Sequence, residues 1–509
     1  MAGNDTKFTI GIGARRVPLR TRWTTISVAV LAIFAVQANP ARVFAQTNGT
    51  WTSGTGAWSN SAKWSGNFIA GGTNATATFT TSGGTATLTS SIVLGNITTL
   101  ATSPRTRINA TTSEELQFAT TTGTAPTVTA AGRAEIAAII TGTQGYTKAG
   151  TGDLYIWAPN TYTGVTTISA GRIRLQAATS GSGLGAAGAG NGTVVQSAGT
   201  LMLDSAVTVD AEPLTISGTG NANQGSLRQQ SGNGTFAGPI TLTGSANITA
   251  NTGATLTLSG SIDPNSYQLN LGDGGNYIVS GGFVGTSGTV SFTGPGLIFL
   301  SGSSSFTGTT SVGNATGLVT MTGFMAGLMD FTPGAARTLV GTGTFNGGLS
   351  MGQNATLAPG ASDASTDYGT ITTTTLNLID GTVALGIQDA TTYDRLVMTA
   401  GSDGLTLQGV NKPLLTLDFA NAITSGTLDL FSFTGLSGSF QGVSSTGVYV
   451  GAWVNSGDTW SLQSQNQTLT FSASTGDLVV VPEPSTIALL GASLAAACLI
   501  RRRRQGTPD

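Results

Sequence analysis

Apolar residues alternate with threonine and serine in short runs along most of the chain between Gln46 and Val481. Residues 255–258 read Thr-Leu-Thr-Leu, and residues 290–293 read Val-Ser-Phe-Thr. A period of two indicates strands that bury one face, and the Gly, Asn and Ser residues between the runs indicate tight bends. Residues 297–300 are continuously apolar, as in a strand buried on both faces. The pattern therefore predicts an all-β fold of many short strands.

One stretch indicates how the strands are connected. Runs with a period of two stand at residues 154–156, 166–168 and 173–175. Asn160 and Gly164 lie between the first two runs, and both residue types tolerate the positive φ of a tight bend. Three short strands per turn is the geometry of a right-handed parallel β-helix, in which each turn pairs its backbone with the turns above and below. We therefore predict such a solenoid.

A weaker copy of this stretch lies 144 residues further along the chain. It keeps the glycines, the apolar pairs and the aromatic residue, but Phe292 stands where the first copy has Lys148. This is how a structural repeat behaves, because a catalytic repeat would keep its polar groups. The matching positions are Gly150, Gly152, Leu154, Ile156, Tyr162, Gly164, Thr166 and Ile168 in the first copy and Gly294, Gly296, Ile298, Leu300, Phe306, Gly308, Thr310 and Val312 in the second.

The first copy, with Gly150, Gly152, Asn160, Tyr162, Gly164 and Thr166 as its motif residues, resembles the autotransporter-associated β-strand repeat of bacterial surface proteins. The resemblance covers about 60 residues well and residues 46–480 loosely. It implies a passenger-type β-helix exposed at the cell surface.

The end of the chain has three distinct parts. The triplet Pro482, Glu483, Pro484 cannot continue a helix or a regular sheet ladder, so we expect an exposed joint that an enzyme can process. An apolar run at residues 487–500 predicts a short helix. Its 14 residues would rise about 21 Å, against a bilayer core of about 30 Å, which suits a transient membrane anchor. Behind it, Arg501, Arg502, Arg503 and Arg504 form a stop-transfer block that stays cytoplasmic and leaves the upstream chain outside.

This arrangement of triplet, apolar run and arginine block resembles the PEP-CTERM sorting signal of exported bacterial proteins. The resemblance implies that a membrane protease of the exosortase type recognises Pro482, Glu483 and Pro484 and then releases or transfers the protein. An ordinary tail anchor behind a proline-containing linker is the alternative.

The beginning of the chain predicts export as well. Arginines at positions 15, 16, 20 and 22 precede an apolar segment at residues 24–36, and residues 43–45 offer a small-residue cleavage site before Gln46. Residues 1–45 therefore read as a secretory signal peptide. General secretion fits better than twin-arginine export, because Pro18 stands where the latter motif prefers a large apolar residue. An uncleaved N-terminal anchor is the alternative.

Composition limits the partners of the exported part. Setting aside residues 1–45 and 481–509 leaves 11 basic and 20 acidic residues, a net charge of about −9, which argues against nucleic acid or an anionic membrane surface as partner. The single cysteine, Cys498, lies in the terminal apolar run, so the body has neither a disulfide nor thiol chemistry.

Changes of rhythm divide the exported part into three regions. Residues 46–110 contain Trp51, Trp58 and Trp64, an aromatic cluster that suits an N-terminal cap, with a sugar-stacking surface as the alternative. Residues 111–360 form the β-helix repeat region. Residues 361–480 have more charge and longer apolar runs, so we expect a C-terminal β-rich region closed by Trp453 and Trp460, either as a wider end of the solenoid or as a small sandwich. Residues 481–509 are the sorting signal.

The sequence indicates no catalytic, cofactor-binding or metal site. The chain has no histidine, which excludes serine–histidine triads and histidine metal ligands. Glu114 and Glu115 are adjacent, so on a strand they would point to opposite faces, unlike the facing carboxylates of a glycosidase. Asp389 and Asp394 with Arg395 are the nearest candidate for a β-helix polysaccharide lyase, and we interpret them as surface residues. Asp273, in a Gly/Asp-rich turn, lacks the tandem copies that a calcium site needs.

The sequence thus favours a non-enzymatic surface or extracellular-matrix protein. Its long Thr/Ser/Asn faces suit adhesion to envelope or extracellular polysaccharide, and self-association through uncapped solenoid ends is a variant of this hypothesis. A carbohydrate-active enzyme on the same scaffold is the alternative. The alternative of an autotransporter with its own outer-membrane barrel is disfavoured, because the chain does not end in a run of amphipathic ten-residue strands with aromatic girdles.

Overall fold

The structure, a computed structural model, describes residues 45–483 except 53, 81–82, 101, 103–104, 122, 177–178, 180, 182, 314–316, 333, 335 and 361–366. All of these belong to one compact unit, residues 42–509. The predicted signal peptide up to residue 44, the helix at 487–500 with Cys498, and Arg501, Arg502, Arg503 and Arg504 lie outside the described residues. The described part contains no helix with the length and apolarity of a membrane span.

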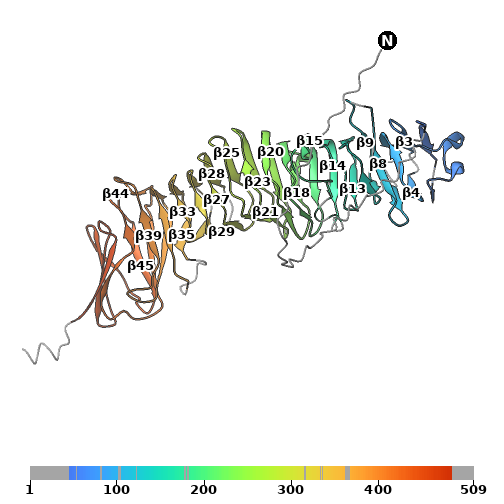
Figure 1. Cartoon of the computed structure of the whole chain (residues 1–509). Helices are drawn as coiled ribbons and strands as arrows, with labels where there is room; N and C mark the ends of the chain where they lie inside the picture. The colour runs from blue at the N-terminus through green and yellow to red at the C-terminus, as the bar shows by residue number, and fades with distance from the viewer. Residues whose placement is uncertain are drawn as a thin grey trace, which may run out of the picture. The chain divides into compact units, whose positions relative to one another are not determined.

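The strands coil in sequence order, and each pairs in parallel with strands of the turns before and after it (Figure 1). Each turn passes over a first, a second and a third face. A turn takes 21 residues where the coil is most regular, as from Val279 to Leu300 to Met321 on the third face. This arrangement confirms the predicted parallel β-helix.

The first face starts as one parallel ladder and continues through Phe283, which pairs with Ile262, into a second ladder. Its strands are β1 (Gly49–Trp51), β3 (Thr76–Phe79), β6 (Asn96–Thr99), β9 (Thr127–Ala130), β12 (Thr147–Ala149), β17 (Leu214–Gly218), β22 (Ile262–Asp263), β27 (Ser303–Ser304), β30 (Phe324–Met325), β33 (Thr344–Phe345), β36 (Thr370–Thr373), β39 (Arg395–Met398) and β43 (Phe431–Ser432).

The second face is one ladder along the whole coil. Its strands are β2 (Thr55–Ala57), β4 (Gly84–Leu88), β7 (Thr106–Ala110), β10 (Ala134–Ile136), β13 (Asp153–Ile156), β18 (Leu227–Gln229), β23 (Gln268–Gly272), β25 (Thr289–Phe292), β28 (Thr309–Val312), β31 (Met329–Phe331), β34 (Leu349–Met351), β37 (Leu376–Ile379), β40 (Leu405–Gln408) and β44 (Leu436–Gly438). Three longer strands span the first and second faces without a break: β14 (Thr166–Leu175), β15 (Thr193–Leu203) and β20 (Ile240–Ala250).

The third face consists of a short ladder followed by a long one. Its strands are β5 (Ile92–Leu94), β8 (Glu115–Phe118), β11 (Ile139–Thr141), β16 (Thr208–Val209), β19 (Asn233–Phe236), β21 (Thr255–Leu258), β24 (Asn276–Val279), β26 (Ile298–Leu300), β29 (Gly317–Met321), β32 (Arg337–Gly341), β35 (Thr356–Pro359), β38 (Thr382–Ile387), β41 (Leu414–Phe419) and β45 (Gly442–Gly447). In the described part of the chain, the short 3-10 turns η1 (Ser61–Lys63), η2 (Ser65–Asn67) and η4 (Asn221–Asn223) lie between strands.

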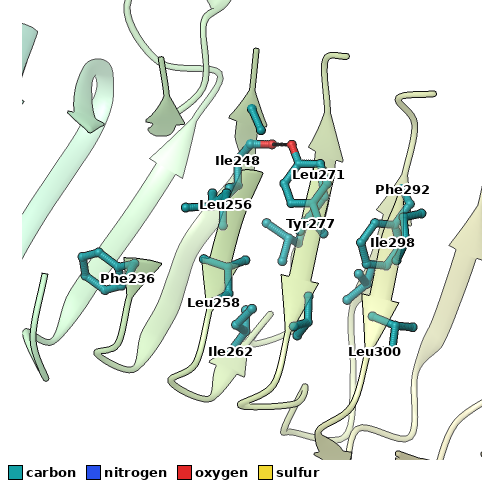
Figure 2. Packing of buried hydrophobic residues seen from close by; sticks show 14 of the residues in the cluster. Phe236, Ile248, Leu256, Leu258, Ile262, Leu271, Tyr277, Phe292, Ile298 and Leu300 are labelled. Carbon is teal, nitrogen blue, oxygen red and sulfur yellow. Dashed lines mark hydrogen bonds between the residues drawn. The ribbon is translucent and has the colours of Figure 1, made fainter. Parts of the chain in front are cut away.

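Alternate residues of each strand point into the coil and stack on their counterparts in the next turn. On the third face Leu256 lies opposite Tyr277, and Tyr277 lies opposite Ile298 (Figure 2). The Tyr277 hydroxyl donates a hydrogen bond to the Ile248 carbonyl oxygen at 3.1 Å, so its polar end is satisfied inside the core. Full burial of one such aliphatic side chain is worth about 2 kcal/mol, which makes the stacked interior the main source of stability.

One detail of the predicted strand arrangement is wrong. We expected residues 154–156, 166–168 and 173–175 to be the three strands of one turn. Instead Leu154 pairs with Ile173 in the following turn, and residues 166–175 are the single strand β14. Gly171, with φ of 68°, lets β14 bend from the first face to the second without a loop.

The N-terminal tryptophans are buried against one another. Trp64 lies edge-on to Trp51 and Trp58, with ring centroids 5.2 and 4.8 Å apart, and all three side chains are at most 3% exposed. The indole N–H of Trp58 donates to the Ala70 carbonyl oxygen at 3.0 Å. The rings therefore fill the end of the core, and none of them offers a free face for stacking on a sugar.

At the other end the parallel coil continues to β45 and gives way to a five-stranded antiparallel sheet. In spatial order its strands are β42 (Gly426–Asp429), β49 (Asp477–Pro482), β48 (Gln467–Ser472), β47 (Thr459–Ser464) and β46 (Val454–Ser456). Trp453 and Trp460 are half-buried against the core, and the Trp453 indole N–H donates to the Ser445 hydroxyl at 2.9 Å.

Candidate functional site

The repeat glycines form the corner between β12 and β13. Gly150 has φ of 75°, and a Cβ on Gly152 would overlap the carbonyl oxygen of Gly132 in the turn below. In the second copy a Cβ on Gly296 would overlap the Gly275 carbonyl oxygen in the same way. Glycine is needed at both corners because the backbone of the neighbouring turn lies too close for a side chain.

Asn160 stabilises the stacking of turns through its side chain, a role that the sequence did not indicate. Its side chain is 1% exposed, accepts a hydrogen bond from the Ile140 N–H at 2.9 Å, and donates one to the Gly183 carbonyl oxygen at 2.7 Å. Asn160 does not have a positive φ, whereas Gly164, with φ of 92°, makes the expected bend. The carboxamide joins the turn before to the turn after.

The remaining motif residues lie inside the coil. The hydroxyls of Tyr162 and Thr166 are 2.6 Å apart, and both side chains are fully buried. Thr166 pairs with Thr193 on the next turn, and the Thr193 hydroxyl donates to Glu212 at 2.8 Å. Burial raises the pKa of Glu212 to about 7. One tyrosine, two threonines and one glutamate therefore form a polar cluster inside the coil.

The two copies of the repeat occupy different faces. Leu154 and Ile156 lie on the second face, whereas their counterparts Ile298 and Leu300 lie on the third face. Thr166 lies on the first face and its counterpart Thr310 on the second. The pattern therefore specifies a strand, a corner and a further strand, and leaves open the face on which the unit lies.

Lys148 points into the core, in register with Val128 and Ile168. Its side chain is buried, and its ammonium donates to the carbonyl oxygens of Ala149, Gly150 and Ala170 at 2.9, 2.8 and 3.1 Å. Burial lowers the pKa of Lys148 to about 8. The cation satisfies corner carbonyls that face inward.

Arg337 has the same role at the corner of the second copy, although it belongs to a later turn. Its buried guanidinium donates to the carbonyl oxygens of Gly294 and Gly296, the latter at 3.4 Å, and burial lowers its pKa. We expected a structural repeat without a matching charge. A cation is nevertheless present at both corners. It precedes the corner glycines in the first copy and follows them by about two turns in the second.

Six of the 11 basic residues of the body gather on the outside of the second face between residues 105 and 228. We call the outward-facing residues that pair directly across successive strands β7, β10, β13, β14, β15 and β18 the guanidinium column: Arg107, Glu135, Tyr155, Arg174, Met202 and Arg228. The column is not visible in the sequence, because residues 19 to 28 positions apart become neighbours only through the register of the turns.

Arginines bind the carboxylates in and beside the guanidinium column. The side chain of Glu135 is buried, and three arginines surround it: Arg133 at 2.7 Å, Arg107 at 3.1 Å and Arg105 at 3.4 Å. Further along the coil, Arg174 binds Asp204 at 2.9 Å, and Arg172 binds Asp153 at 2.6 Å. Each of these three carboxylates is thus held in place by at least one arginine.

Tyr155 lies at the centre of the guanidinium column. The guanidinium carbon of Arg133 is 4.2 Å from the centre of its ring, and that of Arg174 is 4.6 Å away. Arg107 lies 5.6 Å from the ring centre of the nearby Trp157. Such cation–π contacts hold long arginine side chains against the sheet and leave half-buried aromatic groups at the surface.

The guanidinium column leads to a hollow of about 370 Å³ that we call the polar pocket. Asn247 and Asn270, opposite each other on β20 and β23, form its floor and share a hydrogen bond of 3.0 Å. The turn η4 provides Asn223 at its rim. The lining residues are Asn223, Arg228, Asn247, Thr249, Asn270, Gly272, Asp273 and Thr293.

The carboxylates singled out in the sequence have local roles. Hydrogen bonds from Thr111 and Thr112 lower the pKa of Glu114 to about 2. Asp389 accepts hydrogen bonds from Thr391 and Thr392, and Asp394 is buried between the backbone N–H groups of Gly369 and Gly386.

The other charged candidates are separated from these groups. Arg395 pairs with Asp429, and Asp273, which has φ of 73°, binds Arg228 at 3.3 Å. The described part of the chain brings no three His, Cys, Asp or Glu side chains together around a common metal position.

The sorting triplet begins at the end of the antiparallel sheet. Pro482 is the last residue of β49, opposite Gln467 on β48, and the Glu483 N–H donates to the Asn466 carbonyl oxygen at 2.9 Å. Pro482 and Glu483 are exposed. Pro484 lies outside the described residues.

Two family models match the chain. The PEP-CTERM protein-sorting motif matches residues 480–504, and the passenger-associated-transport-repeat matches residues 147–175. The chain carries both motifs. The first implies export, sorting to the cell surface and processing by exosortase, a membrane enzyme, and the second is typical of β-helix passengers. No curated protein matches the sequence.

Proposed function

We propose that this exported passenger is a non-enzymatic surface or extracellular-matrix protein that binds exopolysaccharide along the outside of its second face. The observation that carries the proposal is the continuity of the guanidinium column with the polar pocket. Together they offer aromatic rings, guanidinium groups and carboxamides along one face. We further propose that the predicted helix at 487–500 anchors the chain in the membrane until the sorting enzyme acts.

The spacing of these groups suits a linear polymer. Adjacent turns of a parallel β-helix lie about 4.8 Å apart, close to the length of one sugar unit. Asn247 and Asn270 present carboxamides on successive turns, and a carboxamide can donate to one sugar hydroxyl and accept from another. Each contact is weak, but a polymer of repeated sugar units can make many such contacts along the face at the same time.

Binding is favoured over catalysis by the state of the carboxylates. Glycoside hydrolysis requires two facing carboxyl groups with different protonation states. On the second face Glu135, Asp153 and Asp204 are held by arginines. A carbohydrate-active enzyme is the second candidate, and the appearance of unsaturated or reducing-end products from pectin, alginate or xylan would favour it.

The test uses processed protein and exopolysaccharide from the same cells. Asn247→Ala combined with Asn270→Ala removes the floor of the polar pocket, and we expect at least a tenfold loss of affinity in a sedimentation assay, since each neutral hydrogen bond is worth about 1 kcal/mol. Phe299→Ala is the control, because Phe299 is an exposed residue on the third face. Equal binding by all three proteins would contradict the proposal.

A further inference from the structure

The last strand of the fold carries the beginning of the sorting motif. β49 lies between β42 and β48, but its two neighbours cover different parts of it. β42 pairs with residues 477–480 only, whereas β48 pairs with residues 478–482. Residues 481 and 482 are therefore held along one edge, and no strand of the described chain pairs with their other edge.

The geometry of Pro482 fits this half-open position. Successive N–H groups of a strand point to opposite edges, and the N–H of Glu483 points toward β48, where it meets Asn466. The nitrogen of Pro482 therefore faces the open edge, where its missing hydrogen costs no ladder bond. The proline also prevents another chain from pairing fully with that edge. We expected that the proline-containing motif could not continue a regular sheet ladder, but it can begin at the end of the last strand, β49.

Side-chain contacts fix β48, the strand that pairs with the start of the motif. The Gln467 carboxamide donates to the carbonyl oxygens of Ile423 and Thr424 at 2.6 and 2.9 Å. The hydroxyl of buried Tyr449 contacts the other end of that carboxamide and accepts from the Ile423 N–H at 2.8 Å. Gln467 is the residue opposite Pro482, so the network fixes the part of β48 beside which the motif begins.

We infer that the C-terminal antiparallel sheet is a presentation surface for the sorting enzyme. It holds residues 481–483 extended and exposed beside β48. The enzyme recognises this segment from the open edge of the folded sheet. Val481 is 52% exposed, which leaves an apolar contact beside the motif. A peptide held in its bound conformation loses less entropy on recognition than a flexible linker, and processing is thereby coupled to completed folding of the sheet. The inference depends on the sorting motif and is independent of polysaccharide binding.

The decisive variant inserts Gly-Ser-Gly-Ser between Val481 and Pro482 in the full chain, which leaves the motif and everything after it unchanged. It is expressed in cells that process the unaltered chain, and mass spectrometry measures the processed fraction. We expect at least a fivefold fall, because the motif no longer lies beside β48. The same insertion after Val410, which is 94% exposed, is the control and should be processed normally. Unchanged or faster processing of the first variant would overturn the inference.

A second pair of variants tests the anchoring residue. Gln467→Ala removes the contacts to Ile423, Thr424 and Tyr449, whereas Gln463→Ala changes an exposed glutamine in the same hairpin. Processing should fall at least threefold for Gln467→Ala and remain unchanged for Gln463→Ala. Limited proteolysis checks that the body stays folded in both. Equal processing of the two variants would contradict a role for the sheet, whatever the polysaccharide assay shows.

Discussion

The two copies of the repeat share a corner and differ in almost everything that the corner contacts. Both have glycines where the next turn comes too close for a side chain, and both have a buried cation on the corner carbonyls. The first copy supplies that cation itself through Lys148, whereas the second receives Arg337 from a later turn and places Phe292 in the core. The repeat therefore specifies backbone geometry, whereas the side chains that contact each corner vary from copy to copy.

The largest expected effect comes from giving the second copy the lysine of the first. Phe292→Lys buries an ammonium whose nearest equivalent acceptor, the Gly294 carbonyl oxygen, is already bound by Arg337. We expect a loss of about 4 kcal/mol or more in the free energy of unfolding, measured with denaturant. Phe299→Lys, at an exposed position of the same copy, should change it by less than about 0.5 kcal/mol. Similar stabilities for the two variants would show that the copies are interchangeable.

Removing the corner cation tests whether the copies are equivalent there. Lys148→Met and Arg337→Met both leave inward-facing carbonyl oxygens without a donor, so each should cost about 3 kcal/mol in denaturant unfolding. Lys412→Met, at an exposed lysine bonded to Ser439, is the control and should be close to neutral. A large loss in the free energy of unfolding for only one of the two corner variants would contradict the proposed equivalence of the two corners.

The polar cluster beside the first copy predicts a pH dependence. The folded-state pKa of Glu212 is raised to about 7, above its usual value of 4.5, so its stabilising contribution is present below pH 4.5 and is lost as pH rises through 7. We expect Glu212→Gln to be more stable than the unaltered chain by about 2 kcal/mol at pH 8 and similar to it at pH 4.5. Thermal unfolding at the two pH values measures the difference. A difference independent of pH would mean that Glu212 is ionised in the fold. In the second copy Thr310, the counterpart of Thr166, lies beside the sulfur of Met325.

The smallest effect concerns the outer surface. Tyr155 and Phe299 occupy matching positions, but Arg133 and Arg174 cover the ring of Tyr155, whereas no arginine in the described part of the chain makes a cation–π contact with Phe299. Tyr155→Ala should therefore cost about 1 kcal/mol in denaturant unfolding, and Phe299→Ala less than about 0.5 kcal/mol. Equal costs would indicate that the guanidinium column adds nothing to stability.

Much of the fold was predictable because its causes are local. The alternation of Leu, Ile and Val with Thr and Ser indicates strands, Gly164 indicates a bend, and the triplet before the apolar run indicates a sorting signal wherever the rest of the chain folds. The candidate site was not predictable in the same way. Glu135 and Arg107 stand 28 residues apart, and their pairing depends on the length of the intervening turn.

Local residue patterns thus specify most of the strands, the glycine corners, the stacking architecture and the sorting motif. The tertiary structure decided which face each unit occupies, which cation reaches which corner, and that Pro482 begins its motif on a sheet. The reason is physical: strand and bend preferences act over a few residues, whereas turns of unequal length set the register between residues about 20 to 30 apart. Only the assembled coil brings those residues together.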